Sequence, residues 1–118
     1  MKKKILVYDN QLGYYDLLKR TIKNGFEFSL FDENYHFLNS EDIVIFFLYD
    51  ELELLDLVKL YREDVPFIVG CSKTHQHCLS GKENIYTINL GQTKDEIIKS
   101  LYEIFNIIQQ TAEKEEAL

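Results

Sequence analysis

The chain has 118 residues, of which 46% are hydrophobic, so it can bury one hydrophobic core and intrinsic disorder is excluded as its main state. It carries 13 basic and 20 acidic residues and a formal net charge of −7. A surface of that sign repels phosphate backbones, so we expect no nucleic-acid partner. The two cysteines, Cys71 and Cys78, are too few for a disulfide scaffold and indicate a reduced, intracellular setting.

The first apolar run indicates where the protein resides. After the basic start of the chain, only Ile5-Leu6-Val7-Tyr8 is continuously apolar, and this is too short for the hydrophobic region of a signal peptide. No window reaches the apolar length of a membrane span. We therefore expect a cytoplasmic protein with no membrane partner. One domain over residues 1–112 is expected, followed by a polar tail over residues 113–118 that frays.

Apolar runs alternate with helical patterns along the chain. Compact apolar or alternating runs predict strands over residues 5–8, 26–31, 43–49, 67–71 and 85–88. Amphipathic spacing predicts helices over residues 11–23, over residues 51–62 and after Thr93, which is an N-cap candidate with Glu96 three residues on. In the second helix, Leu52, Leu55, Val58 and Tyr61 are expected to face inward. The pattern does not decide whether segments 32–41 and 73–84 form helices.

Five strands that alternate with helices predict an α/β fold. The size and the right-handed crossover rule favour a flavodoxin-like, doubly wound parallel sheet with strand order 2-1-3-4-5 and three layers. Ligands of such folds bind beyond the carboxyl ends of strands 1 and 3. The residues that follow the strands are therefore the first candidates for a site.

Four strand segments carry a family resemblance. Lys4–Asn10 ends in an acidic residue and its amide neighbour, and Asp42–Phe47, Val65–Ser72 and Ile85–Leu90 follow as further apolar strands. Over residues 2–110 the chain resembles the receiver domain of two-component response regulators. The resemblance implies a five-stranded signalling domain whose strand ends hold Mg²⁺ and a phospho-accepting aspartate.

The resemblance also implies that this pocket is degenerate. The matching positions are an Mg²⁺-binding acidic pair, a phospho-acceptor, a hydroxyl, an aromatic and a lysine, and here they hold Asp9 with Asn10, Phe47, Cys71, Tyr86 and Asn89. Within this pocket, only Asp9 and Asn10 are candidate metal ligands, and they are weak ones. We therefore expect a stand-alone pseudo-receiver that acts in signalling through protein–protein contacts, with no conventional aspartate phosphorylation, no enzymatic activity and no cofactor.

Two other functions stay open. Asp50 is an alternative phospho-acceptor, with Asp9 and Asn10 holding Mg²⁺, although its position also suits an N-cap with Glu53 three residues on. Asp9 itself is expected to bond the start of the following helix. The second function is a metal- or ligand-binding domain that uses Cys71, His75, His77 and Cys78, although their spacing matches no common zinc pattern. Cys71 is otherwise a reactive thiol or a buried strand end.

The charge distribution indicates where a protein partner would bind. Residues 41–64 hold eight acids and two bases, whereas residues 1–31 hold six bases and three acids. The acidic helix over residues 51–62, with Glu53 and Asp56, is thus expected to bind a basic partner. The alternative surface is the face of the last strand and last helix, which carries Tyr86, Tyr102 and Phe105. A homodimer is also open.

Overall fold

The sheet determines the architecture of the protein. The structure is a computed structural model that describes residues 3–11, 13–22, 25–31, 41–72 and 83–117, with side chains described as far as residue 112. Five strands pair in parallel in the order β2-β1-β3-β4-β5, which confirms the predicted fold class. Their bounds are β1 Lys3–Tyr8, β2 Phe26–Leu30, β3 Ile43–Phe47, β4 Phe67–Cys71 and β5 Ile85–Asn89.

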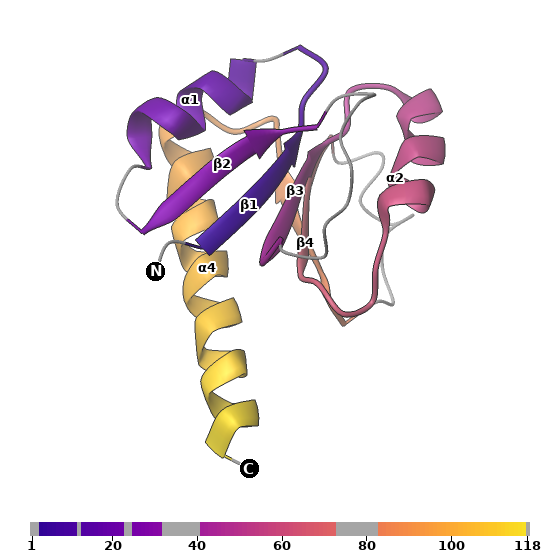
Figure 1. Ribbon diagram of the computed structural model, residues 1–118. Helices are drawn as coiled ribbons and strands as arrows, with labels where there is room; N and C mark the ends of the chain where they lie inside the picture. The colour runs from indigo at the N-terminus through magenta and orange to yellow at the C-terminus, as the bar shows by residue number, and fades with distance from the viewer. Residues whose placement is uncertain (1–2, 12, 23–24, 32–40, 73–82, 118) are drawn as a thin grey trace.

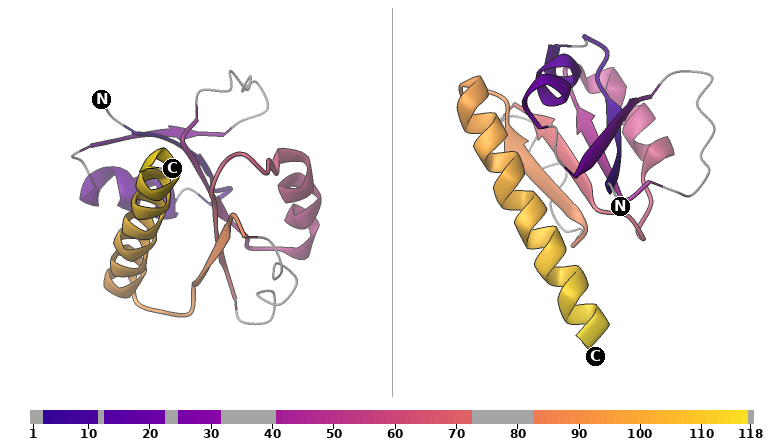
Figure 2. Two further views of the ribbon diagram at one scale, coloured as in Figure 1. Left: turned by 90° about the horizontal axis from the view of Figure 1, so that it is seen from below. Right: turned by 60° about the vertical axis from the view of Figure 1, so that its left-hand side comes forward.

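Helices cover both faces of the sheet and make three layers. Helix α1 (Gly13–Thr21) and helix α4 (Lys94–Ala117) lie on one face. The 3₁₀ turn η1 (Glu51–Glu53) and helix α2 (Leu54–Leu60) lie on the other, as the view from below in Figure 2 shows. Alternate residues of β1 and β3 point into the two cores, which is why these central strands read as continuous apolar runs. The undecided segments 32–41 and 73–84 lie almost wholly outside the described residues.

Helix α4 is capped as predicted and is longer than predicted. The Glu96 amide donates to the Thr93 hydroxyl at 3.3 Å, and that hydroxyl donates to the Glu96 carboxylate at 2.9 Å. The helix continues to Ala117 and extends past one end of the sheet (Figure 1), so it includes most of the tail expected to fray. Among the described helices, none is both long enough and apolar enough to cross a membrane.

The orientation of α2 differs from the sequence prediction. Leu52, Leu55 and Val58 were expected in the core, but they are 74%, 65% and 74% exposed. Leu57 and Leu60 are buried against the sheet instead. Two apolar sets with the same three-residue spacing run along this segment, so periodicity alone cannot choose between them. The three exposed side chains form a strip that we call the α2 stripe.

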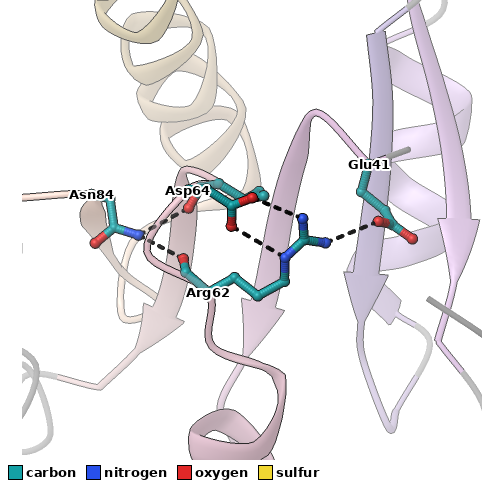
Figure 3. Close-up of polar contacts among 5 residues, drawn as sticks. Glu41, Arg62, Asp64 and Asn84 are labelled. Carbon is teal, nitrogen blue, oxygen red and sulfur yellow. Dashed lines mark hydrogen bonds and ion pairs between the residues drawn. The ribbon is translucent and has the colours of Figure 1, made fainter. Parts of the chain in front are cut away.

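An ion-pair cluster fastens the other end of α2 to the sheet (Figure 3). The Arg62 guanidinium contacts the Glu41 carboxylate at 3.4 Å and the Asp64 carboxylate at 3.1 Å. The Asn84 amide donates to the backbone carbonyls of Arg62 and Val65, both at 2.9 Å. The hydrogen bond from Arg62 is the main cause that lowers the pKa of the Asp64 carboxyl. This cluster joins the starts of β3, β4 and β5 and is structural.

Truncation of one leucine from each apolar set tests this orientation. We expect Leu57→Ala to lower the free energy of unfolding by about 2–5 kcal/mol, because it leaves a cavity in the core. Leu55→Ala should change it by no more than about 0.5 kcal/mol, because that side chain already meets water. Urea denaturation followed by circular dichroism measures both. A larger loss for Leu55→Ala than for Leu57→Ala would reverse the assignment of the two faces.

Candidate functional site

The carboxyl ends of β1 and β3 form the candidate site. These strands are neighbours, and the chain leaves β1 toward α1 on one face and β3 toward α2 on the other. Such a divergence leaves a crevice at the sheet edge, and ligands of open α/β sheets bind there. Polar side chains from both strand ends meet at this edge.

The Asp9 side chain caps the first turn of helix α1. Its Oδ2 accepts hydrogen bonds from the backbone amides of Tyr14 and Tyr15, both at 2.9 Å. Its Oδ1 accepts the Gln11 amide at 3.2 Å and the Tyr49 hydroxyl at 2.5 Å. The residue is only 3% exposed. The structure thus confirms that Asp9 bonds the start of the helix, and the carboxylate is saturated by donors from its own chain.

Asp50 begins η1, as the N-cap interpretation predicted. Its Oδ1 accepts the Leu52 amide at 2.9 Å. In return the Glu53 Oε1 accepts the Asp50 amide at 2.9 Å and the Tyr49 amide at 2.7 Å, which completes a capping box. The other Glu53 oxygen accepts the side-chain amide of Asn10. Glu53 is therefore buried, and it does not lie on the outer acidic surface where sequence reasoning placed it.

Two tyrosines complete this network, and sequence reasoning missed both. The Tyr8 hydroxyl donates to the Asp56 carboxylate at 2.5 Å and accepts the Asn10 amide at 3.2 Å. Burial, and next the hydrogen bond to Asp56, raise the pKa of Tyr8 to about 12. Burial and the bond to Asp9 likewise raise the pKa of Tyr49. Both phenols thus stay protonated at neutral pH and act as donors. In the sequence, each of these tyrosines ends an apolar run, and its hydroxyl was the feature that could have indicated a polar contact at the strand end.

A recess of about 300 Å³ opens between these strand ends and α2, and we call it the carboxyl-edge recess. Asp50, Glu53 and Asp56 contribute carboxylates to its wall. The other side chains that line it are neutral: Tyr8, Asn10, Gln11, Tyr49 and Leu52. The described lining therefore carries negative charge and holds neither a lysine nor an arginine.

The remaining receiver-like positions do not join this recess. Phe47 is buried and stacks on Tyr14 with ring centroids 4.6 Å apart. Cys71 is fully buried at the end of β4, in the core under α2. Its register partner Asn89 folds into a turn, where its side chain accepts the Gly91 amide at 2.9 Å. Of the residues expected in the receiver-like pocket, Asp9 and Asn10 thus remain together at the carboxyl edge. Asn10 and the alternative acceptor Asp50 both line the recess.

Metal ligation finds no support in the described part of the chain. There, no group of three or more His, Cys, Asp or Glu residues could hold a metal ion. The candidates His75, His77 and Cys78 lie outside the described residues. Of the two weak Mg²⁺ candidates, Asp9 has both carboxylate oxygens in hydrogen bonds within the chain, and Asn10 is held through its side-chain nitrogen by the Tyr8 hydroxyl and Glu53.

The alternative docking face lies beside a larger groove at the opposite end of the sheet. This groove has a volume of about 1070 Å³ and runs between α4 and the amino ends of the strands. Tyr86, Tyr102 and Phe105 contribute aromatic rings to its lining. Tyr86 is half-buried and packs against the core under α1 and α4. Tyr102 is 44% exposed, so this face is less open than the α2 stripe.

Substitution of Asp9 tests whether its carboxylate is structural. Asp9→Asn removes one of the two acceptor oxygens and points an amide at donors, so we expect a loss of about 1–3 kcal/mol in the free energy of unfolding. Asp50→Asn is the matched control, because asparagine caps helices as well as aspartate, and it should cost less than about 0.5 kcal/mol. Urea denaturation measures both. A gain in stability for Asp9→Asn would indicate instead a carboxylate held for a ligand.

Comparison with known proteins identifies no relative of this chain: no family model matches it, and neither does a curated protein or a solved structure. What the carboxyl edge can do is therefore inferred from its own side chains.

Proposed function

We propose that the chain is a receiver-like docking domain that acts through protein contacts and carries out no phosphoryl transfer. The α2 stripe is the observation that carries this proposal. Leu52, Leu55 and Val58 are 74%, 65% and 74% exposed, and they are the three most exposed of the large hydrophobic side chains described. They lie on one face of one short helical segment.

Exposure of these side chains is unfavourable for the isolated domain. Full burial of a leucine or valine side chain contributes about 1.5–3 kcal/mol to stability. Each of the three side chains of the stripe lacks most of this contribution. Single apolar residues on a surface need no explanation, but a contiguous apolar patch marks an interaction surface. The apolar centre of a protein–protein interface has this character. A partner that covers the stripe would recover the lost burial.

The strand ends support the second half of the proposal. A receiver needs a nucleophilic carboxylate that is free to accept a phosphoryl group, together with a cation that offsets its charge. Phe47 offers no nucleophile, and Asp9 accepts four hydrogen bonds from its own chain. Asp50, the alternative acceptor, caps η1. Both aspartates cap the start of a helix, so phosphorylation at Asp50 is the less favoured function.

Incubation with a small phosphodonor tests the absence of phosphoryl transfer. We expect no gain of a phosphoryl mass when the protein is incubated with phosphoramidate or acetyl phosphate and Mg²⁺, because no described carboxylate is both free and paired with a metal site. Intact-mass spectrometry measures this, with a competent receiver domain as the positive control. A phosphoryl gain that Asp50→Ala abolishes would establish the alternative function.

Disruption of the α2 stripe tests docking. Leu55→Glu places a charge in the centre of the stripe, and we expect it to weaken partner binding at least about tenfold, which corresponds to about 1.4 kcal/mol. Gln110→Glu, on exposed α4, adds the same charge away from the stripe and is the matched control. Quantitative affinity capture from the native source compares the two variants with the wild type, after circular dichroism confirms their folding. Equal capture by all three baits would contradict docking through the stripe.

A further inference from the structure

We infer that the α2 stripe and the carboxyl-edge recess form one surface, which takes an amphipathic helix that carries a lysine or arginine beside its apolar face. The inference rests on the proposed function and adds the chemistry of the partner. Leu52 connects the two parts, because it belongs to the stripe and also lines the recess. A segment that covers the stripe at Leu52 therefore also meets the mouth of the recess.

The stripe fits a helix as its occupant. Its three side chains recur every three residues along η1 and α2, and they extend about 9 Å along the axis. This is the length of about two helical turns. An amphipathic helix whose apolar side chains recur three and four residues apart can pack against such a strip, as one helix packs on the face of another.

The recess requires a positive charge on that helix. Asp50, Glu53 and Asp56 contribute three carboxylates to the lining, and the described part of the lining includes no lysine or arginine. Arg62, the one arginine near the end of α2, is held by Glu41 and Asp64 at the amino end of the sheet. Among the described residues, none of the lining neutralises these carboxylates, and charge complementarity favours a cationic side chain from the partner.

Two of these carboxylates are able to receive that cation. Asp50 and Asp56 each use one oxygen in a bond to a described residue, Leu52 or Tyr8, so the second oxygen of each can accept from a ligand. The phenols of Tyr8 and Tyr49 add no charge, because burial and the neighbouring carboxylates raise their pKa. An arginine would donate several hydrogen bonds to such a site, and a lysine would act as a point charge.

Selection from a library of displayed helical peptides tests the inference with the full chain. We expect the binders to share apolar residues three and four positions apart, and to be enriched in lysine or arginine at one flank of that face. In a representative binder, replacement of the selected arginine by citrulline, or of the selected lysine by norleucine, should weaken binding about tenfold, as expected for the loss of one charge-assisted contact. Fluorescence anisotropy measures the affinity.

Two protein variants separate the two parts of the surface. The double variant Asp50→Asn/Asp56→Asn keeps the cap and an acceptor for Tyr8 but removes two charges, and it should also weaken the binders about tenfold. Its matched control is Glu27→Gln/Glu103→Gln, which changes the net charge equally at exposed positions of β2 and α4. Circular dichroism confirms that both variants fold.

The outcomes distinguish the inference from the proposed function. Binders that Leu55→Glu weakens, but that show no basic enrichment and ignore the Asp50/Asp56 variant, would overturn the basic partner and leave docking through the stripe intact. Binders that ignore Leu55→Glu, or the recovery of no binder, would overturn docking through the stripe and the inference with it. Loss of affinity in both variants, with the control unchanged, supports the inference.

Discussion

The buried carboxylate of Glu53 determines the arrangement of the carboxyl edge. It accepts the amides of Tyr49 and Asp50 from the end of β3 and the side-chain amide of Asn10 from the end of β1. A buried charge is costly unless it is hydrogen-bonded, and here three donors from two chain segments satisfy it. The Glu53 side chain thus joins the carboxyl ends of β1 and β3 to η1, which leads into α2.

This anchor also sets the rotation of the helix that follows. With Glu53 turned inward, Leu57 and Leu60 follow on the core side, and Leu55 faces solvent. The opposite rotation would bury the stripe, but it would withdraw the carboxylate from the amides that it satisfies. Within the described side chains, no buried nitrogen or oxygen lacks a partner, so the observed rotation leaves no polar group unmet. The rotation of α2 therefore has two consequences: the polar network is fully hydrogen-bonded, and the α2 stripe is exposed to solvent.

The sequence predicts the sheet well because its signals are redundant. The strand order follows from alternating runs with few allowed crossovers, and the caps at Asp9, Asp50 and Thr93 follow from local residue spacing. The facing of α2 has no such redundancy. Its two leucine-rich sets have equal spacing, and the choice between them depends on the burial of Glu53, whose donors include Asn10, more than forty positions earlier in the chain. Long-range hydrogen bonds of this kind leave no local pattern.

The same geometry changes what the acidic segment over residues 41–64 means. The sequence places its charges together, but the fold divides them between the two ends of the sheet. Glu41 and Asp64 bind Arg62 at the amino end, and Asp42 there accepts the Lys4 amide.

At the carboxyl end, Asp50, Glu53 and Asp56 line the recess that borders the α2 stripe at Leu52. The negative charge of this recess is thus a small group of carboxylates at one end of three apolar side chains, whereas the sequence analysis expected an acidic helix over residues 51–62. In the proposed complex, such a group would contribute to the choice of partner through one or two specific contacts, while the burial of Leu52, Leu55 and Val58 would supply most of the affinity.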